Sequence, residues 1–144
     1  MMTNWALMTC QMWRVSSRTV LFLLYLSWPV PPITAAEPLV VAVDIQSRVF
    51  IPHRAALHHG QPTVLVFRNH DSELHAFVPS ELFAGVNLNV TGNGAPEFGP
   101  EGFKRAIIPP EGSVEIHFTP ERAGEYSYIC DMPGHQMAAM IVVE

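Results

Sequence analysis

The chain has 144 residues, of which 49% are hydrophobic and 15% charged; this composition can bury the core of one domain and excludes a disordered chain. It carries 13 Asp and Glu against 8 Lys and Arg and has no basic run, so we expect no nucleic-acid partner. Thirteen prolines and nine glycines favour short strands joined by turns.

Residues 1–36 have the order of a secretory signal peptide. Arg14 and Arg18 precede an apolar run at 19–28, and small residues then lead to Ala36. We predict cleavage after Ala36 and a periplasmic, bacterial location. An uncleaved membrane anchor is the alternative, but ten apolar residues are too few to cross about 30 Å of hydrocarbon.

The predicted mature domain, 37–144, keeps six basic residues, all 13 acidic residues and a single cysteine, Cys130. A secreted domain with one cysteine cannot form an internal disulfide, so this thiol needs another explanation. We expect the domain to be a monomer that meets a membrane only through transient docking or an uncleaved signal.

Apolar and alternating segments predict six strands, in chain order 39–45, 62–69, 74–78, 113–118, 124–130 and 139–143. Short strands at this spacing predict an all-β fold, an antiparallel Greek-key β-sandwich. No helical period exceeds about two turns, and 79–84 is the one candidate for a short helix. Residues 85–102 are rich in glycine, proline and asparagine, and predict a long surface loop with room for a short strand at its start.

Four residues have side chains that bind soft metals. Cys130, His135 and Met140 are spaced C-x4-H-x4-M, and His75 lies 55 residues before the cysteine. A thiolate, two imidazoles and a thioether suit copper in both of its oxidation states. Each residue alone could be an ordinary buried side chain, but together they predict a metal site, with Pro133-Gly134 making the turn between Cys130 and His135.

The segments GQPTVLVFRNHDSELHAFV and AGEYSYICDMPGHQMAAMIVVE resemble the cupredoxins, the type 1 blue-copper proteins, and the ligand loop is most like those of rusticyanin and auracyanin. This resemblance implies a cupredoxin domain over 37–144 that holds one type 1 copper. It implies His75, Cys130 and His135 as equatorial ligands and Met140 as the weak axial ligand. Met137 and Met132 lie in the same loop and remain alternatives for the axial position.

The expected function is single-electron transfer between redox partners, such as a cytochrome or a copper oxidase or reductase, and not catalysis. Four protein ligands leave little room for a substrate. A periplasmic copper chaperone or storage protein is the alternative. A copper enzyme would need a second, open site, for which the only candidates are His53, His58 and His59, and we expect these to be surface histidines.

Two finer expectations concern the surroundings of the metal. We expect His135 to expose one ring edge through a small apolar patch of Met132, Pro133, Met137 and Ala138. In cupredoxins the residue after the first histidine ligand often helps to hold the cysteine sulfur. Here that residue is Ala76, which can offer only its backbone N–H.

Overall fold

The computed structural model describes residues 36–144, so the predicted signal peptide lies almost wholly outside the described residues. No helix in this part of the chain is long and apolar enough to cross a membrane. The described residues form eleven strands: β1 (Leu39–Gln46), β2 (Val49–Ile51), β3 (Arg54–Leu57), β4 (Thr63–Asn69), β5 (His75–Pro79), β6 (Leu88–Gly92), β7 (Ala95–Gly99), β8 (Gly102–Ile108), β9 (Ser113–Phe118), β10 (Gly124–Cys130) and β11 (Met137–Val143).

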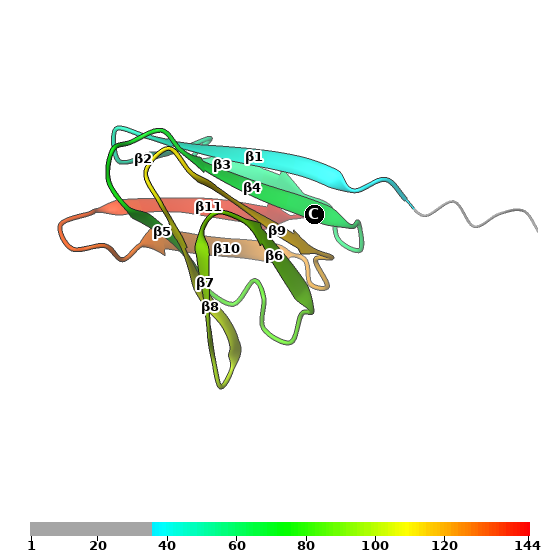
Figure 1. Cartoon of the computed structure of the whole chain (residues 1–144). Coiled ribbons are helices and arrows are strands. Elements are labelled where there is room, and N and C mark those ends of the chain that lie inside the picture. Colours follow the sequence, from blue (N-terminus) through cyan, green and yellow to red (C-terminus); the bar gives the residue numbers. More distant parts are fainter. Residues whose placement is uncertain (1–35) are drawn as a thin grey trace, which may run out of the picture. The chain divides into compact units, whose positions relative to one another are not determined.

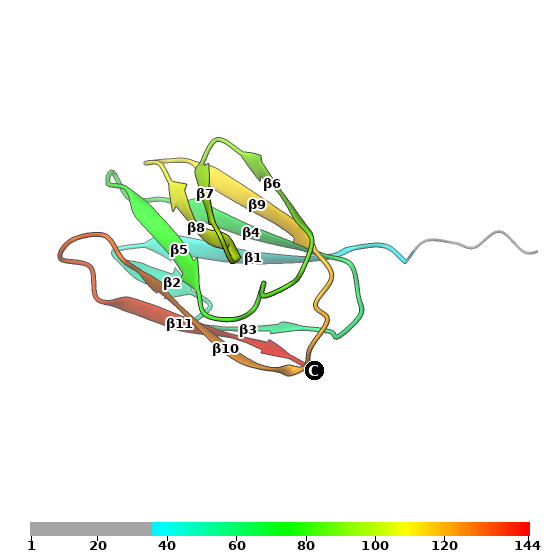
Figure 2. The same ribbon diagram turned by 90° about the horizontal axis from the view of Figure 1, so that it is seen from below.

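The strands form two sheets that face each other (Figures 1 and 2). One sheet has the order β2-β1-β4-β9-β6 and the other the order β3-β11-β10-β5-β8-β7. The predicted all-β sandwich is therefore confirmed. The sheets are mixed rather than purely antiparallel, because β1 pairs parallel with β4 and β3 pairs parallel with β11. β1 and β4 are parallel because the chain leaves the first sheet after β2, adds β3 to the second sheet and returns as β4.

The six strands predicted from the sequence are present with ends shifted by no more than two residues, and the unpredicted strands are mostly sheet edges. β2, β6, β3 and β7 are the four edge strands, each with neighbours on one side only. An edge strand exposes much of its surface, so its sequence alternates weakly. Residues 85–102 accordingly contain β6 and β7 and are not one long loop, and 79–84 form turns and no helix.

An aromatic cluster fills the core next to the predicted metal site. The ring centroids of Phe67 and Phe77 lie 4.2 Å apart, and those of Phe50 and Tyr128 lie 4.8 Å apart. All four side chains are almost fully buried, and burial of each phenylalanine contributes about 1.5–3 kcal/mol to stability. Tyr128 and Cys130 are two residues apart on β10 and therefore face the same side of the sheet. The tightly packed aromatic cluster therefore lies next to Cys130 and supports it.

Candidate metal centre

Three predicted ligands meet at one end of the sandwich. Cys130 ends β10, His75 begins the neighbouring strand β5, and His135 lies in the loop between β10 and β11. The Sγ atom of Cys130 lies 3.9 Å from Nδ1 of His75 and 3.4 Å from Nδ1 of His135. The three candidate ligand atoms lie within 4.8 Å of one another. Residues 55 positions apart in the sequence are therefore brought together by the pairing of β5 with β10.

The loop that carries His135 turns as the sequence predicts. The backbone N–H of His135 donates to the carbonyl of Met132 at 3.0 Å, and Gly134 has a φ of 79°. Glycine adopts this left-handed conformation without the steric cost that a Cβ atom brings. The turn points His135 back toward Cys130.

Met137, and not Met140, faces this cluster. Met137 is the register partner of Cys130 across the β10–β11 ladder and is 4% exposed, and it forms a His-Cys-His-Met set with the three residues above. Side chains alternate between the two faces of a strand, so Met140, three residues later, points to the outer face. There its Sδ accepts a hydrogen bond from Nη1 of Arg54 at 3.3 Å. The predicted axial ligand Met140 is thus not brought to the site, and its alternative Met137 is.

Asp71 orients the ring of His75. Its Oδ2 lies 2.9 Å from Nε2 of His75, and its two oxygens also accept the backbone N–H groups of Ser47 and Arg48 at 2.7 and 2.9 Å. Burial raises the pKa of the Asp71 carboxyl, but the hydrogen bonds from Arg48, Ser47 and His75 outweigh this and hold it below its ordinary value. A carboxylate that accepts a hydrogen bond from Nε2–H of His75 leaves Nδ1 without a proton and facing Cys130, as a metal ligand requires.

The Cys130 sulfur receives one hydrogen bond from the backbone. The N–H of Ala76 donates to Sγ at 3.3 Å, as expected for a residue with no polar side chain. Cys130 itself is 3% exposed. A hydrogen bond to a thiolate withdraws charge from the sulfur and so tunes the potential of a bound metal.

The side chain of His135 is largely covered. This side chain is 5% exposed, and its Nε2 lies 3.5 Å from Oε2 of Glu73. Glu73 is in turn paired with the guanidinium of Arg48. A charged pair, in place of an apolar patch alone, therefore lies against the outer edge of this ring.

A second charged network ties the ligand loop to the β7–β8 hairpin. Arg105 on β8 donates through Nη1 to Asp131, the residue after Cys130, at 2.8 Å. Its Nε and Nη2 donate to the two carboxylate oxygens of Glu97 on β7 at 2.8 and 3.0 Å. These two carboxylates raise the pKa of the Arg105 guanidinium. The network fixes the start of the loop that carries the ligands.

The charged residues that support the ligands were not predicted from the sequence, because charged residues usually lie on solvated surfaces. A signal was nevertheless present in the segment HDSELH, where Asp71 and Glu73 precede His75 by four and two residues. Carboxylates so close to a candidate histidine ligand are typical partners for its second ring nitrogen. Arg48 and Arg105 gave no such signal, because their partners are distant in sequence.

The other histidines do not assemble a second site in the described part of the chain. The described residues contain two groups of three or more possible metal ligands, and both groups contain His75. The ring of His59 lies 2.9 Å from the carbonyl of Glu121. His53 and His58 belong to neither group.

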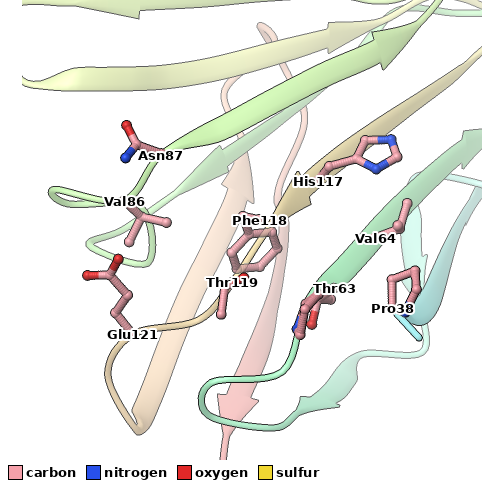
Figure 3. Close-up of a pocket in the computed structure, with 10 residues that line it drawn as sticks. Pro38, Thr63, Val64, Val86, Asn87, His117, Phe118, Thr119 and Glu121 are labelled. Atoms are coloured by element: carbon pink, nitrogen blue, oxygen red, sulfur yellow. The ribbon is translucent and has the colours of Figure 1, made fainter. Parts of the chain in front are cut away.

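The described part of the chain has a surface pocket of about 340 Å³ (Figure 3). It is lined by the starts of β1 and β4 and the end of β9, whereas the end of β4 leads toward His75. None of the predicted ligands lines it, and we assign it no part in the metal site. The lining includes Pro38, Thr63, Val64, Val86, Asn87, His117, Phe118, Thr119 and Glu121.

Comparison with known proteins identifies the family. Residues 18–143 match the family model described as "Cupredoxin-like domain". The chain therefore belongs to the cupredoxin-like family, and the His75, Cys130, His135 and Met137 set is consistent with the type 1 copper that this family binds. The predicted family and the predicted copper cofactor are confirmed.

Solved structures support the same fold. The chain is similar to auracyanin A, a "blue" copper protein from the green thermophilic photosynthetic bacterium Chloroflexus aurantiacus, with a TM-score of 0.56 and 19% identity over 75% of this chain and 100% of that one. It is similar to auracyanin B, with a TM-score of 0.55 and 20% identity over 77% and 93% of the two chains. The Cu(I) form of an amicyanin point mutant gives a TM-score of 0.50 and 21% identity over 76% and 85%. A search of curated protein sequences gives no match.

Proposed function

We propose that this chain is a type 1 copper protein that carries single electrons between redox partners. One observation carries the proposal: a thiolate and two imidazole nitrogens converge in a buried site, with a thioether on the same face. Copper bound by such ligands supplies a one-electron couple between its two common oxidation states. Auracyanin A and amicyanin, which share the fold, are copper proteins.

The surroundings of the ligands support a carrier. His75 and Cys130 are buried on paired strands next to the aromatic cluster, and Asp71 fixes the His75 ring. Ligands held this firmly change little in position when the charge of the site changes, which keeps the barrier to electron transfer low. Catalytic metal sites keep an open position for substrate, and four protein donors in a closed site leave none. We therefore propose a carrier and not an enzyme.

Burial of the ligands also argues against the alternative, a copper chaperone or storage protein. A chaperone must let an acceptor protein reach its metal ligands. Here Cys130 is 3% exposed and the His135 side chain 5%. Retention of the metal fits these exposures better than delivery does.

Export and partners are part of the same proposal. The signal-like sequence at 1–36 supports a periplasmic location after cleavage. The excess of acidic over basic residues in 37–144 would speed encounters with redox proteins whose docking faces are basic. N-terminal sequencing of protein recovered from the periplasm tests the first point; an intact N-terminus in the cytoplasm would overturn it.

The test of the metal site is an absorption and EPR spectrum of residues 37–144 loaded with Cu(II). We expect an intense thiolate-to-copper band and a narrow hyperfine splitting, because sulfur shares the unpaired electron with the metal. Cys130→Ala and His135→Ala should abolish the band, whereas His59→Ala, a matched surface histidine, should keep it. A reversible one-electron couple on an electrode then supports the carrier. A protein that retains only Cu(I), or a band that survives Cys130→Ala, would favour the chaperone.

A further inference from the structure

The tight turn between β1 and β2 contacts both carboxylates that face the ligand histidines. The backbone N–H of Arg48 donates to Asp71, which faces Nε2 of His75. The guanidinium of the same residue donates to both oxygens of Glu73, with Nη2 to Oε2 at 2.7 Å. That Oε2 lies 3.5 Å from Nε2 of His135. One residue, 23 or more positions away from both carboxylates, therefore touches the supports of both histidines.

This turn has an unfavourable backbone conformation for its residue types. Ser47 and Arg48 have φ values of 54° and 59°, and Gln46 pairs with Val49 around them. Two-residue hairpin turns with positive φ at both central positions strongly favour Asn-Gly, because side chains with a Cβ clash in this region. The turn requires this conformation but does not require an arginine, so the presence of Arg48 in place of glycine points to a role for its side chain.

The contacts of Arg48 indicate what that role is. The Arg48 guanidinium and the Glu73 carboxylate form a bidentate ion pair. Both side chains of the pair are partly exposed, at 52% and 36%, so the pair adds little to fold stability. The pair affects the geometry of the site more than the stability of the fold, because a bidentate guanidinium fixes a carboxylate in direction as well as position.

We propose that Arg48 is a positioning residue for the copper site: its side chain acts through Glu73 on His135, and its backbone N–H acts through Asp71 on His75. The inference rests on the proposed copper site. The strained turn holds the carboxylate of Glu73 against the outer nitrogen of His135, so that the inner nitrogen keeps its direction toward Cys130. Loss of such outer-shell partners typically costs about 10–100-fold in metal affinity.

Arg48→Gly tests the proposal because three explanations predict different results. Glycine suits the positive φ, so the metal-free protein should unfold at the same temperature as the wild type or higher. Removal of a positive charge by itself would strengthen Cu(II) binding. Loss of positioning should instead weaken Cu(II) binding by about 10–100-fold, measured by competition with a chelator. A merely structural role would lower stability and affinity together.

Glu73→Gln and Glu125→Gln form a matched pair. Both remove the carboxylate of an arginine-paired glutamate, but Glu125 pairs with Arg54 on the outer face of the sheet. Glu73→Gln should weaken Cu(II) more than Cu(I), and each tenfold change in that ratio raises the potential by about 59 mV. Glu125→Gln should leave affinity and potential unchanged.

The outcomes separate this inference from the proposed function. If the wild type shows no cysteine-dependent Cu(II) spectrum, the proposed copper site fails and the inference falls with it. If the wild type shows that spectrum but Arg48→Gly binds Cu(II) as tightly as the wild type or more tightly, the positioning role alone is overturned. Weaker Cu(II) binding by Arg48→Gly with unimpaired metal-free stability, and a raised potential in Glu73→Gln, would establish it.

Discussion

Cys130 and Met137 are directly opposite each other in the β10–β11 ladder, while Met140 is paired with Ser127 and lies on the other face of the sheet. The pairing register therefore decides which methionine can approach the thiolate. A slip by one residue would exchange the two faces of β11, and the burial of Ile141 and Val143 in the core prevents such a slip.

The first prediction compares Met137→Leu with Met140→Leu. Leucine has nearly the volume of methionine, so each variant should lose less than about 1.5 kcal/mol of stability. Met137→Leu removes a thioether that would stabilise Cu(II), so its reduction potential should rise and its EPR spectrum should change. Met140→Leu should keep the wild-type values. If the reduction potential changes only in Met140→Leu, the axial ligand is Met140, as the spacing in the sequence favours.

The sequence predicted three members of the cluster but favoured Met140 over Met137 as the fourth, because the type of donor atom and the face of the strand on which it lies are different kinds of information. Cys130, His135 and His75 are recognisable from their chemistry and spacing. The strand MAAMIVV is apolar throughout, so nothing in it distinguishes the inward face of Met137 from the outward face of Met140. That distinction depends on pairing with β10.

Likewise, the strands that could be predicted from the sequence are ones that lie inside a sheet and not at its edge. The central strand β4 has buried residues on both faces, which gives a strong apolar signal. The edge strand β7 has one intermediate residue among exposed ones, and it gave the signal of a loop. Support of the site by Arg48 and Arg105 was not predictable, because it depends on contacts between elements distant in the sequence.

The second prediction concerns the hydroxyl of Tyr128. This group is buried among the core aromatics and has no hydrogen-bond partner among the described residues, and burial raises its pKa. An unpartnered buried hydroxyl costs about 1–3 kcal/mol. Tyr128→Phe keeps the ring contacts with Phe50 and should raise the free energy of unfolding by about 1 kcal/mol in a urea titration, with the copper spectrum unchanged. A loss of stability would show that the hydroxyl has a partner.

The third prediction concerns pH and the network beside the ligand loop. The hydrogen bond from Arg105 lowers the pKa of the Glu97 carboxyl below its ordinary 4.5. A lowered pKa in the folded state contributes stability that is complete above about pH 4.5 and is lost as the pH falls through the folded-state pKa. The urea concentration at which the protein unfolds should therefore differ less between about pH 3.5 and about pH 7 in Glu97→Gln than in the wild type. An equal pH dependence in both proteins would contradict this assignment.

The fourth prediction uses a redox-inert metal to separate ligation from electron transfer. Zn(II) accepts the same thiolate and imidazole donors, and any metal that binds only the folded state stabilises it by mass action. At about 1,000 times its dissociation constant, Zn(II) should raise the free energy of unfolding by about 4 kcal/mol, and a chelator should reverse the change.

The stabilisation by Zn(II) should depend on the cluster and not on histidine content. Cys130→Ala and His75→Ala remove ligands and should abolish it, whereas His70→Ala removes a histidine that pairs with Asp44 at the surface and should retain it. Equal stabilisation of the wild type and Cys130→Ala would place the metal elsewhere. Loss of stabilisation in both ligand variants, with no loss in the surface variant, would show that the residues joined by β5 and β10 form one binding site, whichever ion occupies it.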